Sequence, residues 1–279
     1  MALSIQSNAA SKSIQNQLGR TNNDLSVALE RLGSGFRINS AKDDAAGLQI
    51  ANRLNAQVRG QEAAIYNANN ANSMLQTAEG AFEEMTNIAY RMKELATQGA
   101  NGTNNTSEYT AMGAEFDALS AELTNIMTNT SYGSGTTLLD ATTGKFSAAV
   151  DLQIGSSSAE TMQVDISAQI TAVDGSITAL TGLADQTASS TTMDEIDTLI
   201  NDIGAARASL GATMNRLDHT INNVTNMVEN TQASASQLMD ADFAKETSNM
   251  TKQQLLMNSG ISVLSASNST TQMIGSLLR

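Results

Sequence analysis

The sequence predicts a mainly α-helical protein in which long helices from the N- and C-terminal halves pair antiparallel as a coiled coil. A small β-hairpin region is expected in mid-chain. Three observations support this fold class. Hydrophobic residues recur every seven positions in both halves, and a mid-chain stretch alternates hydrophobic with other residues. The 279 residues also contain no proline, although average usage is about 5%, so no proline interrupts the long helices.

The clearest helical signal lies between residues 196 and 238. Two hydrophobic series with a seven-residue step interleave there, four and three residues apart, which is typical of a coiled-coil seam. An unbroken helix over this stretch would be about 65 Å long. Arg207 and Thr231 are polar residues within the two series. The predicted seam residues are Ile196, Ile200, Ile203, Leu210, Met214, Leu217, Ile221, Val224 and Val228.

The N-terminal half contains a complementary pattern. Leucines recur every seven residues from Leu18 to Leu32, and the hydrophobic pattern resumes between residues 54 and 95. The glycines and serines of "GSGFRINS" (33–40) predict a break between these two stretches. A second turn is predicted at "TQGANGTNN" (97–105), followed by a shorter helix.

The middle of the chain differs in kind. Hydrophobic residues occupy every second position from Phe146 to Ile154 and again from Met162 to Ile166, with a Gly/Ser-rich turn between them. This period of two predicts a β-hairpin with one buried face near residues 145–167.

The chain is expected to divide into terminal segments and a central rod. Residues 1–40 and 236–279 carry weak hydrophobic stripes, and short amphipathic helices of this kind are marginal in water without a partner. These terminal segments should therefore pair in one coiled-coil layer. Residues 41–235 should form a rod domain of long helices that includes the hairpin.

The formal net charge of −13 is unevenly distributed. Residues 1–60 carry +3 and residues 240–279 carry zero, so the part between them carries −16. An acidic surface repels nucleic acid and anionic membranes, and we expect neither as a partner. The sequence has no cysteine, which excludes disulfides and thiolate ligands. We also expect no Sec-type signal, because the N-terminus lacks a basic stretch followed by a hydrophobic segment.

Asp43 and Asp44 are adjacent carboxylates that could belong to an active site or to the start of a helix. Ser40 precedes Asp43 by the spacing of a capping box, and the helix dipole stabilises acids in a first turn. A catalytic pair would need surroundings that shift one pKa, and no aromatic or histidine-lined stretch lies nearby in the sequence. Ser40 and Asp43 are therefore predicted to cap a helix.

His219 is the single histidine of the sequence. A zinc site needs three or four ligands from histidine, cysteine and carboxylates, and the HExxH signature needs two histidines. The sequence also has no G-x-S-x-G, G-x-G-x-x-G or Walker A motif. We accordingly expect no enzyme activity, no metal site and no cofactor.

Several stretches resemble the terminal regions of bacterial flagellins. In the N-terminal half they are "LERLGSGFRINSAKDDAAGLQIANRL" (29–54), "AEGAFEEM" (78–85) and "ELATQGANGTNN" (94–105). In the C-terminal half they are "RASLGATMNRLDHTINNVTNMVEN" (207–230), "DADFAKETSNMTKQQLL" (240–256) and "SLLR" (276–279). The motifs occur in the order found in that family.

The resemblance implies a structural subunit that self-assembles into the extracellular filament of the bacterial flagellum. Flagellin termini pair as an inner coiled-coil layer surrounded by a rod, and the short stretch between residues 140 and 185 leaves room for no large outer domain. The termini would be disordered in the monomer and fold on polymerisation. The implied partners are further copies of the chain, an export chaperone and the type III export apparatus, hook-junction and cap proteins, and a host Toll-like receptor.

The family resemblance also assigns residues to a receptor-contact and rod-packing surface. They are Arg91 and Leu95 in "YRMKELATQGANGT" and Glu115 on the following helix. Lys93 stands where the family commonly has a second arginine, which keeps the charge but loses bidentate geometry.

Two alternative functions follow from the same resemblance. One is a hook–filament junction protein, which shares flagellin-like ends. The other is a secreted enzyme on a flagellin scaffold, and the lack of both an insert and an HExxH motif argues against it.

Overall fold

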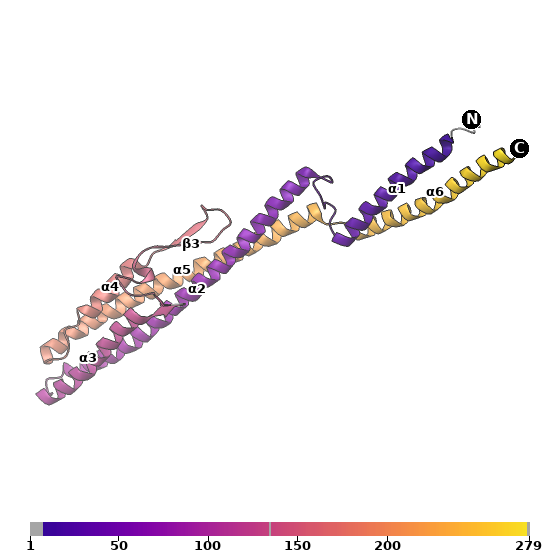
Figure 1. Cartoon of the computed structure of the whole chain (residues 1–279). Helices are drawn as coiled ribbons and strands as arrows, with labels where there is room; N and C mark the ends of the chain where they lie inside the picture. The colour runs from indigo at the N-terminus through magenta and orange to yellow at the C-terminus, as the bar shows by residue number, and fades with distance from the viewer. Residues whose placement is uncertain (1–7, 134, 278–279) are drawn as a thin grey trace. The chain divides into compact units, whose positions relative to one another are not determined.

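A computed structural model describes residues 8–133 and 135–277 of the chain (Figure 1). The described residues are mostly helical, which confirms the predicted mainly α fold class. The elements are α1 (Ala9–Ser34), α2 (Ala45–Gly99), α3 (Thr106–Asn129), β1 (Ser131–Tyr132), β2 (Thr136–Thr137), the 3₁₀ helix η1 (Lys145–Ser147), β3 (Val150–Gln153), β4 (Thr161–Val164), α4 (Ser167–Thr178), α5 (Gln186–Met239) and α6 (Phe243–Leu277).

The chain forms two compact units. Unit 1 contains the described residues up to Ala56 and from Asn230 onward, and unit 2 contains Gln57–Glu229. These boundaries lie inside α2 and α5, whereas the sequence suggested divisions after residues 40 and 235. The assignment of the two units to an inner layer and a rod stays a proposal.

Unit 1 is built on an antiparallel pair of helices, α1 and α6, which lie side by side (Figure 1). At one end of the pair the side-chain amide of Asn8 donates to the carbonyl and the hydroxyl oxygens of Ser267, at 3.4 and 3.3 Å. At the other end Arg31 Nη1 lies 3.3 Å from Glu246 Oε1. Between these ends Thr21 and Ala28 are buried. Small and polar side chains thus form much of this helix–helix contact.

The links between the helices of unit 1 are held by backbone hydrogen bonds. Helix α1 ends where Gly35 takes a φ of 76°, a left-handed conformation that glycine adopts without steric cost. Beyond it the Arg37 N–H donates to the Met239 carbonyl at 2.6 Å, and the Ala241 N–H donates to the Gly35 carbonyl at 2.8 Å. Because Phe36 forms a bridge with Asp240, the two links run together as a short antiparallel ladder.

Unit 2 is a bundle in which α2 and α5 run alongside each other and α3 and α4 add to them (Figure 1). A single hydrophobic core joins the four helices. Its fully buried members include Leu75, Phe82, Met85 and Met92 from α2, Phe116 and Leu123 from α3, Ile170 and Val173 from α4, and Ile196, Ile203, Leu210 and Leu217 from α5.

The turn between α2 and α3 lies within the break predicted at residues 97–105. Asn105 caps α3, because its Oδ1 accepts the N–H groups of Ser107 and Glu108 at 3.0 and 3.1 Å. Glu108 returns the interaction by accepting the Asn105 N–H at 2.8 Å, which completes a capping box.

The predicted hairpin is present but shorter than the alternation suggested. Strands β3 and β4 pair antiparallel, with Val150 opposite Val164, and both of these side chains are buried. Phe146 lies in η1 and not in a strand, where its N–H donates to the Leu138 carbonyl at 3.1 Å. Ile166 likewise lies past β4, at the N-terminal cap of α4. Phe146 and Ile166 therefore fit the alternating hydrophobic pattern although neither belongs to a strand.

A second strand pair and a short helix were not predicted from the sequence. Strands β1 and β2 form a second, very short antiparallel pair. Helix α4 buries Ile170, Val173 and Ile177, whose spacing of three and four residues is a helical signal within a short segment.

We predict opposite effects of alanine at two glycines of unit 2. A Cβ at Gly144 would lie 2.5 Å from the Asp140 carbonyl oxygen and 2.7 Å from that of Leu138, so Gly144→Ala should displace backbone and cost about 1–3 kcal/mol. A Cβ at Gly204, in α5, meets nothing within 4 Å. Gly204→Ala should therefore raise the free energy of unfolding by about 0.5–1 kcal/mol. Urea unfolding measures both, and equal effects of the two variants would contradict the packing described around Gly144.

Candidate functional site

The two adjacent carboxylates before α2 have different structural roles. Asp44 Oδ1 accepts the Gly47 N–H at 2.8 Å, so Asp44 caps the helix, which begins at Ala45. Asp43 Oδ2 accepts the Asn39 and Ser40 N–H groups and the Ser40 hydroxyl at 3.0–3.1 Å. The prediction that Ser40 and Asp43 cap the helix is therefore wrong in detail: they close the turn that precedes it.

The hydrogen bonds to Asp43 act on its charged form. The bonds from the backbone N–H groups of Ser40 and Asn39 lower the pKa of the Asp43 carboxyl below its ordinary value, and the Ser40 hydroxyl adds to this effect. Asp43 is thus a structural anion and not a proton donor at neutral pH.

The first of the two predicted seam series lies in the core. Ile196, Ile203, Leu210 and Leu217 have 0% exposure and Val224 has 7%. The second series, Ile200, Met214, Ile221 and Val228, is only half buried. A third column that the heptad analysis missed is fully buried as well, including Leu199 and Ala206. Because α5 packs against several helices, its hydrophobic stripe is wider than the seam of a two-stranded coiled coil.

The polar residue Arg207 in the seam has a partner on α2. Its Nε donates to Glu79 Oε1 at 2.8 Å, and both side chains are only partly exposed. Glu79 Oε2 is buried without a hydrogen-bond partner among the described residues. The pair places opposite charges at one level of the α2–α5 contact, where unpaired charges would be costly.

Gln61 is a second polar group in the packed face of α2, and it was not predicted from the sequence. Its side chain is 1% exposed, and within the described part of the chain neither its amide nitrogen nor its oxygen has a hydrogen-bond partner. Burying an amide without hydrogen bonds costs free energy of desolvation.

The predicted receptor-contact residues differ in how far their side chains are exposed. Arg91 and Glu115 are about half exposed and form a short ion pair, with Nη2 and Oε1 2.7 Å apart. Leu95 is only 2% exposed and belongs to the core, so the expectation that it lies on the same surface is wrong. The Arg91–Glu115 pair links α2 to α3 at this level, and Leu95 lies in the core that the two helices share.

Arg91 is also held by Glu94, whose Oε2 accepts from Nη1 at 2.9 Å. The hydrogen bonds to Glu115 and Glu94 raise the pKa of the Arg91 guanidinium above its ordinary value. Lys93 points to another element: its Nζ donates to the Met193 carbonyl at 2.9 Å and lies 2.6 Å from Asp197 Oδ2. Lys93 thus ties α2 to the start of α5.

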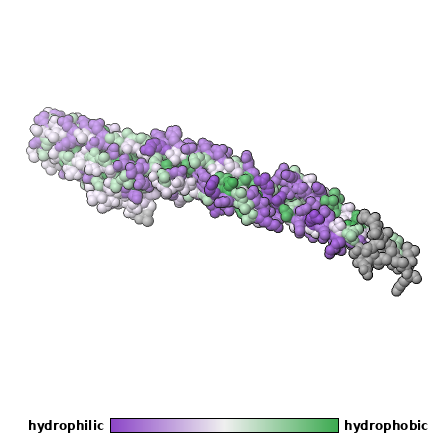
Figure 2. Space-filling model, turned by 90° about the horizontal axis from the view of Figure 1, so that it is seen from above, coloured by the Kyte–Doolittle hydropathy of each residue, from purple (hydrophilic) through white to green (hydrophobic). Residues whose placement is uncertain are grey.

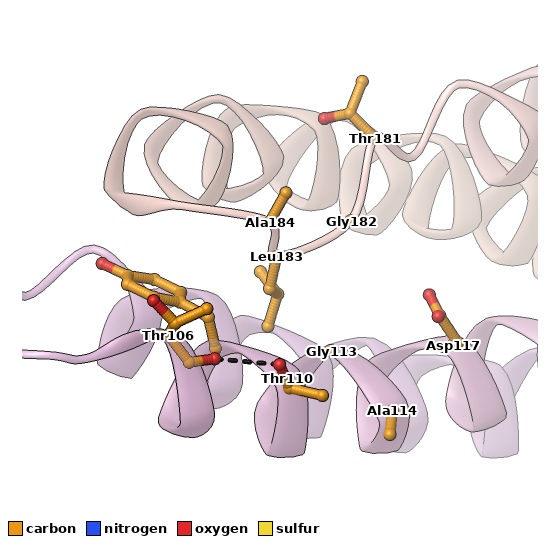
Figure 3. A pocket seen from close by; sticks show the side chains of 10 residues that line it. Thr106, Thr110, Gly113, Ala114, Asp117, Thr181, Gly182, Leu183 and Ala184 are labelled. Atoms are coloured by element: carbon orange, nitrogen blue, oxygen red, sulfur yellow. Dashed lines mark hydrogen bonds between the residues drawn. The ribbon is translucent and has the colours of Figure 1, made fainter.

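A groove of about 460 Å³ lies between α3 and the loop that joins α4 to α5 (Figure 3). Leu183 projects from the loop toward α3, and the Thr110 hydroxyl donates to the Thr106 carbonyl at 2.9 Å. The lining combines hydroxyls, small residues and the single carboxylate of Asp117. It offers neither a histidine nor a cysteine as a nucleophile, base or metal ligand.

Large hydrophobic side chains are exposed mainly in unit 1. Figure 2 shows hydrophobic residues at the surface among hydrophilic ones on the face in view. Of the thirteen such side chains that the described residues expose, ten lie in unit 1: Val27, Leu29, Phe36, Ile50, Phe243, Leu255, Leu256, Ile261, Val263 and Met273. Exposed hydrophobic residues concentrated in this way mark an interaction surface.

Over residues 8–133 and 135–277 no group of three or more histidine, cysteine or acidic side chains could hold a metal ion. Within the same described ranges no helix is both long and hydrophobic enough to span a membrane. A helical core, exposed hydrophobic side chains on the paired terminal helices and surface carboxylates in structural roles are features of a helical structural protein.

Comparison with known proteins identifies the family within this class. Residues 5–144 match the bacterial flagellin N-terminal helical region, and residues 193–278 match the bacterial flagellin C-terminal helical region. The chain belongs to the bacterial flagellin family, whose members are structural proteins of the flagellar filament and not enzymes.

Individual relatives agree with this assignment. A flagellin of Listeria innocua is 37% identical over 99% of both chains. A B-type flagellin of Pseudomonas aeruginosa is 46% identical over 60% of this chain, a match that spans only 33% of the relative. The crystal structure of Bacillus cereus flagellin is 33% identical, with a TM-score of 0.50 over 61% of this chain and 94% of that one.

A putative flagellar hook-associated protein from Vibrio parahaemolyticus has a TM-score of 0.53 over 71% of this chain and 100% of that one. At 16% identity this likeness concerns the fold alone. The hook–filament junction alternative is not favoured, because a flagellin matches the chain over almost its full length.

We predict that the Arg207–Glu79 pair is coupled. Arg207→Leu alone should lower the free energy of unfolding by about 1–2 kcal/mol, because it leaves the partly buried Glu79 carboxylate unpaired. Adding Glu79→Leu should recover most of that loss. A double-mutant cycle by urea unfolding tests this, and additive effects of the two substitutions would show that the pair has no net interaction.

We predict that Asp43 makes stability depend on acid pH. Its folded-state pKa lies below the unfolded value, so its contribution is present above about pH 4 and is lost as pH falls through the folded pKa. Asp43→Asn should therefore unfold at a lower temperature than the native chain at neutral pH, and the difference should shrink below about pH 4. Thermal unfolding across pH measures it. A difference that is constant with pH would contradict the role of the Asp43 charge.

Proposed function

We propose that the chain self-assembles into the bacterial flagellar filament through the exposed hydrophobic faces of α1 and α6. The observation that carries this proposal is that Leu255, Ile261 and Leu29 are 65%, 54% and 51% exposed. They lie on α1 and α6, which pack against each other. Burying such side chains is favourable by about 1.5–3 kcal/mol each. A second copy of the chain is the partner that family membership suggests.

The same helices support the proposal that the ends order on polymerisation. The α1–α6 contact contains buried Ser11 and Thr21, which gain little from burial, and its hydrophobic members such as Leu18 are only half buried. Two long helices with so little hydrophobic contact are marginal by themselves. Neighbouring subunits would supply the missing contact, so folding and assembly would be one coupled step.

The charge distribution supports salt-dependent assembly. The sequence between residues 60 and 240 carries −16, and copies brought side by side in a filament would repel each other through it. Salt shortens the range of this repulsion to about 8–10 Å at physiological strength. Assembly should therefore be promoted by added salt.

Further partners are proposed from family membership. They are the export chaperone and the type III export apparatus, which would deliver the chain to the outside of the cell, and the hook-junction and cap proteins at the filament ends. A host Toll-like receptor is proposed to contact Arg91 and Glu115, which remain about half exposed. Such a receptor would compete with the internal Arg91–Glu115 ion pair, and buried Leu95 would act by supporting the helix.

We predict that Leu255→Ser raises the critical concentration for polymerisation roughly tenfold or more, because one large side chain loses its burial between copies. Gln254→Ser, at an exposed neighbouring position of α6, serves as the matched control and should leave it nearly unchanged. Sedimentation at increasing salt measures the polymer. Digestion of the supernatant and the pellet with a protease should trim both ends only in the supernatant.

Two results would contradict the proposal. If Leu255→Ser polymerises like the native chain, the exposed face of α6 is not an assembly surface. If the termini resist protease equally in the supernatant and in the pellet, their folding is not coupled to polymerisation.

A further inference from the structure

Asn101 and Gly102 form the single Asn–Gly pair of the sequence. They lie in the turn between α2 and α3, and both residues are exposed. The chemistry of this pair is distinctive because the residue after the asparagine has no side chain to shield its backbone nitrogen.

The two groups that would react, the Gly102 backbone nitrogen and the Asn101 side-chain amide, belong to adjacent residues of this turn. The Asn101 Oδ1 accepts the Thr103 N–H at 3.3 Å, which folds the side chain back over the peptide of Gly102. The Gly102 N–H and the Asn101 side-chain NH₂ donate no hydrogen bond within the described part of the chain. The backbone on either side is fixed, since the Asn101 N–H donates to Gln98 and the Asn104 N–H donates to Asn101.

We propose that Asn101 is a site of spontaneous deamidation. The Gly102 backbone nitrogen, after loss of its proton to base, attacks Cγ of Asn101 and forms a new N–Cγ bond. The Cγ–Nδ2 bond breaks and ammonia leaves, which gives a five-membered succinimide. Water then opens either ring C–N bond and yields aspartate or isoaspartate at residue 101. The reaction consumes one water, releases one ammonia and needs no oxidant or reductant.

The Thr103 N–H assists the first step. It donates to the oxygen on which negative charge develops when the nitrogen attacks Cγ. The contact is long in the starting state and would shorten as the oxygen becomes negative. The turn therefore positions the amide and stabilises the intermediate with one donor.

Neighbouring asparagines provide internal controls because their side chains are engaged. Asn104 Nδ2 donates to the Gln98 carbonyl at 2.6 Å. Asn105 Oδ1 accepts two N–H groups at the start of α3, as its capping role requires. The residues that follow them, Asn105 and Thr106, also carry side chains that hinder approach to the backbone nitrogen.

The product changes the turn in two ways. Either product adds one negative charge to a chain that already carries −13. Isoaspartate also adds one methylene to the backbone of a connection that is closed by the Asn104–Gln98 bond and the Asn105 cap. The join between α2 and α3 must then shift to accommodate the longer backbone.

Ageing the purified full-length chain at physiological temperature and mildly alkaline pH tests the proposal. Peptide mapping by mass spectrometry follows the conversion of amide to acid at each asparagine, and isoaspartate is counted by enzymatic methylation. We expect Asn101 to convert about tenfold or more faster than Asn104 or Asn105, because only Asn101 precedes glycine. Equal rates at the three positions, or no conversion at Asn101, would overturn the proposal.

Gly102→Ala provides the matched variant. A Cβ at this position would lie 3.4 Å from the Gln186 side chain, and Gly102 does not need a left-handed conformation, so the turn should persist. Conversion at Asn101 should slow about tenfold, since the methyl group shields the attacking nitrogen. Conversion at the native rate would overturn the mechanism. The comparison within the native chain holds whether or not this variant folds.

Discussion

The structure of unit 2 depends on covering the hydrophobic stripe of α5. Ile196, Ile203, Leu210 and Leu217 are fully buried in the hydrophobic core that α5 shares with α2, α3 and α4. Burial of each such side chain contributes about 1.5–3 kcal/mol, which outweighs any single hydrogen bond or surface ion pair in the chain. The ion pairs of Arg207 with Glu79 and of Lys93 with Asp197 add polar links between α2 and α5.

The sequence predicted the long helices well because their periodicity extends over many turns. A seven-residue step from Ile196 onward is hard to produce by chance, and α5 covers it. Short elements contain too few residues for a pattern to repeat. Three side chains of α4 carry its helical signal, and Phe146 fits an alternating pattern although the hydrogen bond to Leu138 holds it in a 3₁₀ turn. A few positions cannot distinguish these cases without knowledge of the surrounding packing.

The candidate sites were predicted less well, for reasons of geometry. Asp43 and Asp44 are chemically equivalent in the sequence, and only the backbone path decides that Asp44 caps α2. Arg91 and Leu95 are one helical turn apart, yet the edge of the buried stripe passes between them. Gln61 was missed because its burial follows from the neighbouring elements and not from its own type.

The paired links near Gly35 and Ala241 tolerate some sequence changes and forbid others. Two backbone hydrogen bonds pair four main-chain groups there without regard to the side chains they carry, apart from the glycine. Exchanging one residue type for another at Phe36 or Asp240 keeps every donor opposite its acceptor. Deleting a single residue from either link would move all later donors out of step at once. Natural variants of this joint should therefore differ in residue identity while keeping a constant length.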